Sequence, residues 1–245
     1  MNYLRSLLFC GLFLLISCDQ SMLSDKELND LSNMQVNIHL DEDLDNEEEK
    51  DIYVYLTDGK KQIINDKIII KVNDLPLELS VRQELYYTKK SCYILPDFPT
   101  SESYYFEIIL PDSTVYPLAY LKPKLKNKTF EFQVPKIASR HNDVVLQWKN
   151  LSIPSEMTVS KNVESKTSAE ESGGMDSDQT IVENIKTKTG TFLIPRKFLE
   201  DEVNKTNYAE IALNHRESGL INPKLKVNST IFYDSKIERT IEIVE

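Results

Sequence analysis

Apolar and polar residues alternate along most of this chain with a period of two, which is the spacing of β-strands. In residues 34–40 and again in residues 52–57 the apolar residues occupy the even-numbered positions. Residues 130–134 show the clearest alternation, with Phe130, Phe132 and Val134 separated by polar residues. The same pattern predicts further strands at residues 68–72, 77–81, 85–88, 91–95, 104–110, 114–121, 144–148, 157–163, 180–186, 190–194, 208–213, 225–233 and 237–244.

Turn and cap residues separate these predicted strands. Asp58 and Gly59 follow the second strand and predict a hairpin turn. The run at residues 68–72 is apolar on both faces, which predicts an interior strand. Two short helices are also expected. Ser24 and Glu27 have the spacing of a capping box before Leu28 and Leu31, and Pro195 stands where proline opens a helix.

Short strands at this spacing, with no long helical pattern, predict an all-β protein built from antiparallel sandwiches. We expect two tandem immunoglobulin-like domains, the first at residues 34–150 and a smaller one at residues 151–245. The second domain contains a polar stretch without apolar periodicity, residues 164–179, which predicts a mobile loop.

The first eighteen residues have the layout of an export signal. One basic residue, Arg5, precedes an apolar run at residues 7–16, and the run ends at Ser17 and Cys18. This run is about half the ~20 residues that a membrane-spanning helix needs. The segment resembles the lipobox of bacterial lipoproteins, in which the cysteine is lipidated and becomes the first residue after cleavage.

The lipobox resemblance implies that residues 1–17 are a signal peptide and that residues 18–33 form a lipidated tether. Two or more acyl chains on Cys18, such as palmitate, would anchor the protein stably to a membrane. We therefore expect a protein of the cell envelope, held at the outer membrane on its surface or its periplasmic face.

Charge and cysteine content narrow the function further. The chain of 245 residues has a formal net charge of −10, and loss of Arg5 with the signal would leave 28 basic against 39 acidic residues. Such a surface opposes nucleic acid and anionic lipid. After loss of Cys10 and lipidation of Cys18, Cys92 is the remaining thiol, so no internal disulfide is expected. Cys92 lies in a predicted strand, which indicates an inert, buried side chain.

A second resemblance is carried by residues 143–148, Asp-Val-Val-Leu-Gln-Trp, and residues 190–195, Gly-Thr-Phe-Leu-Ile-Pro. Over residues 143–245 the chain resembles the small immunoglobulin-like and fibronectin type III-like modules of exported lipoproteins in Bacteroidetes-type bacteria. The resemblance implies a sandwich fold and a location in the envelope, and it implies no activity. The chain departs from the immunoglobulin pattern because it lacks a pair of cysteines for an inter-sheet bridge.

The densest charge lies at residues 41–51, with eight carboxylates in eleven residues. Calcium takes oxygen ligands, but the glycine-turned spacing of a calcium loop is absent. A solvated connection between two strands is the simpler interpretation, and calcium binding stays an alternative.

Tyrosines supply the candidate binding surface. Nine of the twelve lie between residues 53 and 120. Tyr53 and Tyr55 alternate with Ile52, Val54 and Leu56, so their rings should face outward. Exposed aromatic rings stack on sugar rings and contribute strongly to protein interfaces, which makes these two the candidate contact residues.

No sequence motif indicates catalysis. His39, His141 and His215 lack the spacing of a metal site, and we expect them to be exposed to solvent. No nucleophile elbow or phosphate-binding glycine loop occurs, so we expect no catalytic residues, metal or cofactor. Trp148 alternates with Val144 and Leu146 and should be a core residue.

The sequence therefore favours a membrane-anchored, non-catalytic binding or adhesion module for a glycan or a protein. Two alternatives remain. The chain could be an assembly subunit that binds other envelope proteins, or a hydrolase whose Ser-His-Asp triad assembles only in space.

Overall fold

The computed structural model describes residues 20–44, 50–83, 89–123, 130–151, 155–164, 180–200 and 205–245. Cys18, the centre of the acidic run and the expected loop after residue 164 lie outside these ranges. Among the described residues, no helix has the length and apolarity to cross a membrane. The helices within the described ranges are short: α2 (Asp25–Leu28), the 3-10 helix η2 (Leu31–Asn33) and α3 (Arg196–Leu199).

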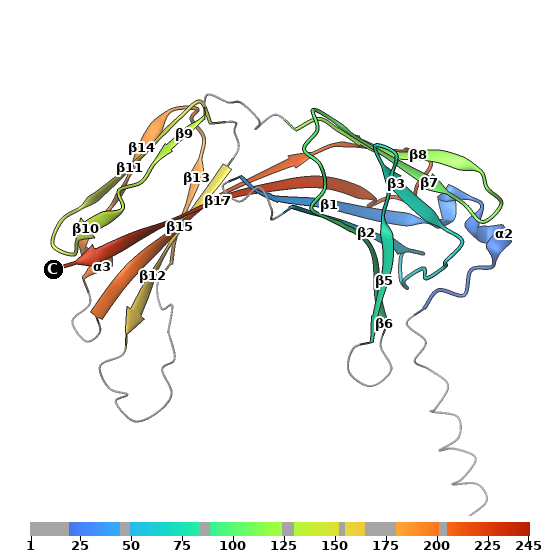
Figure 1. Cartoon of the computed structure of the whole chain (residues 1–245), viewed down its shortest axis with the longest axis horizontal. Coiled ribbons are helices and arrows are strands. Elements are labelled where there is room, and N and C mark those ends of the chain that lie inside the picture. Colours follow the sequence, from blue (N-terminus) through green and yellow to red (C-terminus); the bar gives the residue numbers. More distant parts are fainter. Residues whose placement is uncertain are drawn as a thin grey trace, which may run out of the picture. The chain divides into compact units, whose positions relative to one another are not determined.

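All other elements of the described part of the chain are strands, so the predicted all-β class is confirmed (Figure 1). They are β1 (Gln35–Asp43), β2 (Lys50–Thr57), β3 (Ile69–Val72), β4 (Leu75–Pro76), β5 (Glu78–Gln83), β6 (Lys89–Pro96), β7 (Tyr104–Ile109), β8 (Val115–Leu121), β9 (Glu131–Gln133), β10 (Ile137–Ser139), β11 (Val144–Lys149), β12 (Ser155–Glu164), β13 (Thr180–Ile185), β14 (Gly190–Ile194), β15 (Lys205–Ser218), β16 (Leu220–Ile221) and β17 (Thr230–Val244).

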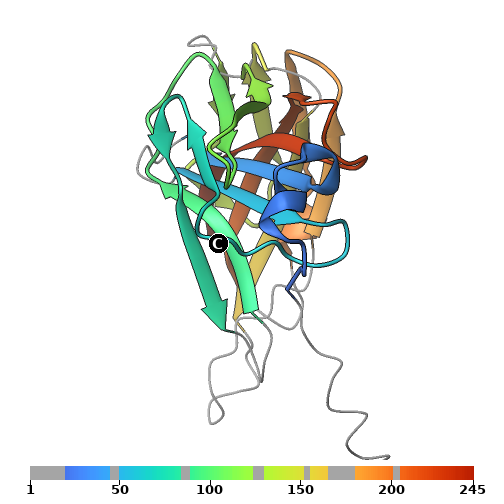
Figure 2. The same ribbon diagram turned by 90° about the vertical axis from the view of Figure 1, so that its right-hand side faces the viewer.

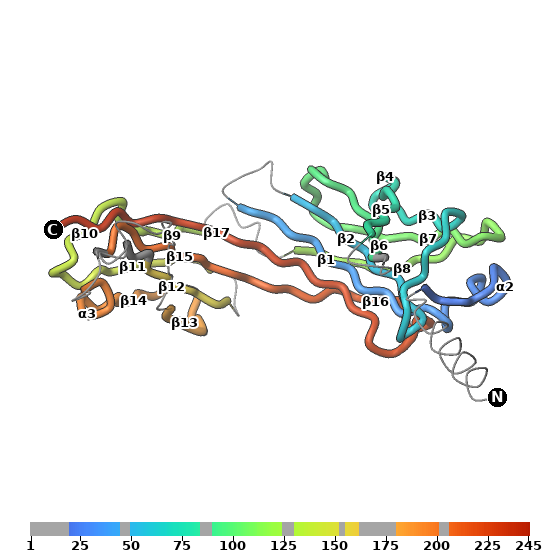
Figure 3. The backbone as a smooth tube through the Cα atoms, turned by 90° about the horizontal axis from the view of Figure 1, so that it is seen from below, coloured from blue at the N-terminus to red at the C-terminus, as the bar shows by residue number. Residues whose placement is uncertain are grey.

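These strands form three sheets within the described residues. The first has the order β13-β12-β15-β17-β1-β2-β6-β5, with β10 added to β17 in parallel. The second has the order β16-β8-β7-β3-β4, and the third has the order β14-β11-β9. Figure 3 shows β17 running between β15 and β1.

The chain divides into two compact units that are discontinuous in sequence. Unit 1 contains residues 1–40, 51–122 and 218–232, and unit 2 contains residues 41–50, 123–217 and 233–245. This division differs from the expected boundary near residue 150, because residues 218–232, from the end of β15 to the start of β17, return to unit 1, and residues 41–50 belong to unit 2. Residues 225–233 and 237–244 were expected as two strands. The structure instead has one continuous strand, β17, over Thr230–Val244, and Leu225 lies in a turn before it.

In unit 1 the period of two decides which side chains are buried. Along β1 and β2 the even-numbered residues are buried, including Val36, Ile38 and Leu40 on β1 and Ile52, Val54 and Leu56 on β2. In the second sheet Tyr104, Phe106 and Ile108 of β7 are buried in the same manner. The run at residues 68–72 is paired on both sides, as predicted, but Ile69 is exposed because one face of this sheet is open to solvent.

The described part of the expected tether is folded structure of unit 1. Ser24 caps α2 through a complete capping box with Glu27, as the sequence predicts. Leu28 and Leu31, in α2 and η2, are buried (blue coils in Figure 2). Since burial of two leucines stabilises this segment by several kcal/mol, on the order of 1.5–3 each, residues 20–33 do not serve as a free linker.

In unit 2 the third sheet packs its alternate residues into the core. Val144, Leu146 and Trp148 of β11 are buried, which confirms Trp148 as a core residue. The indole Nε1 donates to the carbonyl of Thr187 at 3.0 Å. Gly190 is the cross-strand partner of Trp148, so the indole lies over a position without a side chain.

Unit 2 also buries a charged group with its partners. The hydroxyl of Tyr233 donates to Glu42 at 2.5 Å, and Lys50 Nζ lies 3.6 Å from the other carboxylate oxygen. All three side chains are almost fully buried. Because a buried charge is tolerated only with partners, this trio fixes the ends of β1 and β2 against β17.

Replacement of Gly190 by alanine should destabilise the protein by about 1–3 kcal/mol, the range for overpacked cores. A Cβ at this position would lie 2.5 Å from Cζ2 of Trp148. Urea unfolding of Gly190→Ala measures the change. Thr191→Ala, at the next and exposed position of β14, is the matched control and should change the free energy of unfolding by less than about 0.5 kcal/mol. Equal stability of Gly190→Ala and wild type would contradict the close contact.

Candidate functional site

The predicted tyrosines lie on the outward face of the first sheet, in unit 1. The side chain of Tyr55 is 38% exposed, whereas Val54 and Leu56 are buried. Its ring packs edge-on against the ring of His39, with the ring centroids 6.2 Å apart. The centroid of the His39 ring lies in turn 6.0 Å from that of Phe232. The structure therefore extends the sequence-predicted pair into a row of rings across β2, β1 and β17.

Tyr53 is half-buried on the same face, and its hydroxyl donates to Asp51 at 2.8 Å. Ile94 is its cross-strand partner on β6. Much of the Tyr53 ring is thus occupied by neighbours within the sheet. Of the two predicted contact residues, Tyr55 is the more available to a ligand.

The described residues of the acidic run lie at the end of β1 and the start of β2. Glu42 points inward to Lys50 and Tyr233, and Asp51 accepts the hydrogen bond from Tyr53. Residues 45–49 lie outside the described part of the chain. Within the part that is described, no three potential ligands gather into a metal-binding group.

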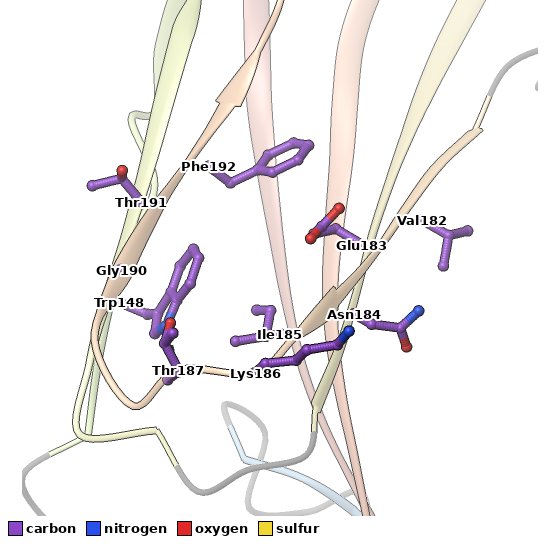
Figure 4. Close-up of a pocket in the computed structure, with 10 residues that line it drawn as sticks. All are labelled: Trp148, Val182, Glu183, Asn184, Ile185, Lys186, Thr187, Gly190, Thr191 and Phe192. Atoms are coloured by element: carbon purple, nitrogen blue, oxygen red, sulfur yellow. The ribbon is translucent and has the colours of Figure 1, made fainter.

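A hollow of about 460 Å³ lies in unit 2 (Figure 4). It opens between β13 and β14, which are the terminal strands of the first and third sheets. Its lining residues are Trp148, Val182, Glu183, Asn184, Ile185, Lys186, Thr187, Gly190, Thr191 and Phe192.

Two side chains on core-facing positions give the hollow its chemistry. Phe192 pairs with the fully buried Leu146, so its ring points between the sheets, yet it stays partly exposed. Glu183 pairs with the fully buried Met157, so its carboxylate also points inward, and it is exposed. Among the described residues no strand covers this side of the sandwich, and a carboxylate and an aromatic ring face the opening of the hollow (Figure 4).

Trp148 and Ile185 form the inner wall of the hollow, where both are buried. The combination of apolar walls with a few polar groups is typical of small-molecule sites. The sequence pattern did not identify this site. One signal was present, because Glu183 interrupts an apolar alternation between Ile181 and Ile185.

A serine, a histidine and a carboxylate do meet in unit 2. Ser155 Oγ lies 2.9 Å from Nδ1 of His215, and Glu217 Oε1 lies 3.3 Å from Nε2. His215 was expected to be exposed, and that expectation is wrong, since it is only 5% exposed. It occupies the core-facing side of β15 in line with Ile211 and Leu213.

This arrangement favours a structural network over a catalytic triad. Ser155 is 6% exposed, and none of the three residues lines the hollow. A nucleophilic serine must reach its substrate, whereas a buried polar group needs only hydrogen-bond partners. The other two histidines behave as expected on the surface: His141 is exposed 3.6 Å from Glu200, and His39 is half-exposed in the ring row.

Cys92 is half-buried on the outward face of β6. Burial raises the pKa of its thiol, against the opposing effect of Arg82. A thiol with a raised pKa is a poor nucleophile at neutral pH. The structure is thus in line with the expectation of an unreactive cysteine.

Comparisons with known proteins add little to this geometry. No protein-family model matches the chain, and no curated protein matches it. A solved structure that aligns with it is SGBP-B of the mixed-linkage glucan utilization locus of Bacteroides ovatus, in complex with a mixed-linkage heptasaccharide. The alignment has 11% identity and a TM-score of 0.24, and it covers 94% of this chain and 47% of that chain. This chain spans about half of that protein's length, and at this TM-score the likeness carries no argument.

The double substitution Tyr53→Ala with Tyr55→Ala should leave the fold intact, because both rings lie on an outward face. We expect a loss of less than about 2 kcal/mol, from strand propensity and cross-strand pairing. Tyr93→Ala is the matched control, since Tyr93 on the adjacent strand points inward and is buried. That control should lose about 3–5 kcal/mol, as large-to-small aromatic substitutions in cores do. If the double variant unfolds, the two rings belong to the core.

Ser155→Ala tests the buried network. Loss of its hydrogen bond to His215 should lower the free energy of unfolding by about 1 kcal/mol. Hydrolysis of a model ester such as p-nitrophenyl acetate should not change. Ser160→Ala, on the opposite face of β12, serves as the stability control. An esterase activity that disappears with Ser155 alone would establish the hydrolase alternative instead.

Proposed function

We propose that this chain is a non-catalytic binding module for a neutral glycan, with the hollow of unit 2 as its binding site. The observation that carries the proposal is the pairing of an inward-facing carboxylate, Glu183, with an aromatic ring, Phe192, at the open side of a sandwich. A carboxylate accepts hydrogen bonds from sugar hydroxyls, and aromatic rings pack against the apolar faces of sugar rings.

The size and charge of the site support this class of ligand. A hollow of about 460 Å³ lies within the usual range for small-ligand sites, roughly 300–1,000 Å³. The net charge of −10 and the carboxylate at the mouth disfavour anionic polysaccharides. Asn184, Lys186 and Thr187 add polar groups along the rim.

A peptide strand is the competing ligand, because β13 and β14 are both terminal strands of their sheets. Addition of a strand to an open sheet edge is a common mode of peptide recognition. Inward-pointing charges on edge strands are a known means of preventing such pairing. Glu183 occupies that role on β13, which favours a sugar over a strand.

The envelope location belongs to the same proposal. The basic residue, the apolar run and Cys18 support a lipid anchor, by which acyl chains would hold the module at the outer membrane. Tyr55, with the ring row on the outward face of unit 1, is proposed as an additional contact surface. The alternative of an assembly subunit requires a protein-binding face, and the second sheet of unit 1 offers one.

The test is calorimetric titration with a panel of neutral oligosaccharides, comparing wild type with Glu183→Gln and Phe192→Ala. Each substitution should weaken binding of the oligosaccharide that wild type recognises by about tenfold or more. Such a loss corresponds to a hydrogen bond to a charged group or to an aromatic contact.

Leu193→Ala is the matched control, because Leu193 lies on the opposite face of β14 from Phe192, is exposed and is not among the lining residues of the hollow. Its affinity should equal that of wild type. Thermal unfolding of each variant separates loss of the site from loss of the fold. Unchanged affinity in both Glu183→Gln and Phe192→Ala would place the sugar site elsewhere. If wild type binds none of the oligosaccharides, the proposal is refuted.

A further inference from the structure

The outward face of the second sheet, in unit 1, carries exposed apolar residues in rows. We call this surface the β7 face and define it by Leu220, Tyr120, Tyr105, Glu107, Lys71, Ile109, Ile69 and Val115. The pairing of β16, β8, β7 and β3 places these side chains on the same side of the sheet. The opposite side of β7 carries the buried Tyr104, Phe106 and Ile108.

The first row of the β7 face is aromatic. Leu220 pairs with Tyr120, and Tyr120 pairs with Tyr105. Leu220 is 71% exposed and Tyr105 is 56% exposed. The two tyrosine rings pack against each other with centroids 4.7 Å apart. We call this exposed row of Leu220, Tyr120 and Tyr105 the tyrosine ledge.

The second row is charged and the third is aliphatic. Glu107 pairs with Lys71 across β7 and β3, and two residues further along Ile109 pairs with Ile69 and with Val115. Ile69 and Val115 are exposed. Exposed aliphatic residues beside tyrosines, on a flat sheet face, are typical of a protein contact surface.

We propose that the β7 face binds the same face of a second copy of this chain. In a two-fold interface every contact between residues i and j occurs twice, so the surface must be complementary to itself. The charged row has this property. A two-fold axis in the plane of the face, parallel to the strands and midway between β7 and β3, places Glu107 over Lys71 of the second copy, and the reverse.

The same axis satisfies the apolar rows. It places Ile109 over Ile69 of the second copy, because it exchanges β7 with β3 and keeps each row in register. Tyr105 then lies over Asn73 of the second copy, because Asn73 exchanges hydrogen bonds with Tyr105 next to the end of β3. Pro76, the cross-strand partner of Lys71, is exposed at the outer edge of the charged row. Two sheet faces related in this way pack with their strands aligned, as in sandwiches.

A sugar ligand fits this face less well. The exposed side chains of the third row are hydrocarbon, and the charges of the second row lie beside each other with opposite sign. Asn73, next to the ledge, uses its carboxamide within the fold, accepting from the amide of Tyr105 and donating to the carbonyl of Ser103. Few polar groups are left to select a sugar.

Sedimentation equilibrium of the full chain in mild detergent at physiological salt tests the proposal. Wild type should form dimers at micromolar concentration. Glu107→Lys alone, and Lys71→Glu alone, should each weaken dimerisation roughly a hundredfold, because like charges then meet across the axis. An equimolar mixture of these two variants should form a one-to-one dimer, since each partner supplies the charge that the other lacks.

The mixture separates an intermolecular effect from a folding effect, because the cross-strand pair within each chain remains like-charged. Glu131→Lys and Lys149→Glu are the matched controls. Each reverses the charge of one member of a cross-strand ion pair, with an N–O distance of 3.2 Å, on the third sheet in unit 2, and each should leave dimerisation unchanged. A monomeric wild type, or a mixture that stays monomeric, would overturn the proposal. The glycan titration is independent of this result, because its variants lie in unit 2.

Discussion

Burial of every second side chain along β17 is the constraint on which the rest of the structure depends. From Ile231 to Ile243 the odd-numbered residues point inward, with Tyr233, Ser235 and Ile237 between them. Because both neighbours of β17 in the sheet, β1 and β15, must match this alternation, it sets which of their residues are buried. A shift of one residue in this strand would turn Ser235 and Tyr233 outward and expose both neighbours' apolar rows.

Buried polar groups are compatible with this fold where they have partners. Tyr233 and Lys50 both reach Glu42, and Ser155 reaches His215. Such partnerships cost little when complete, but removal of one member leaves another buried without it. We regard these contacts as stabilising the fold and not as a functional site, since none of these side chains lines the hollow.

The candidate functional surfaces arise where a side chain does not match the side of the sheet that it faces. In unit 2, Glu183 and Phe192 hold core-facing positions that none of the described strands covers. On the β7 face, outward positions carry Leu220 and Tyr105, where a purely solvated sheet would carry polar residues. The first departure provides a concave, partly charged site, and the second provides a flat, self-complementary one. A small ligand and a protein surface are the respective occupants that these shapes fit.

The sequence by itself determined the strands and the direction of their side chains, because both follow from local periodicity. The alternation at residues 34–40 and 52–57, the capping box of Ser24 and Glu27, and the buried Trp148 were all predictable on that basis. Only the tertiary structure decided which strands pair. The return of residues 218–232 to unit 1, the burial of His215 and the inward position of Glu183 beside Phe192 depend on partners that lie far away in the chain. Periodicity states that a residue faces one side of its strand, but it does not state what covers that side.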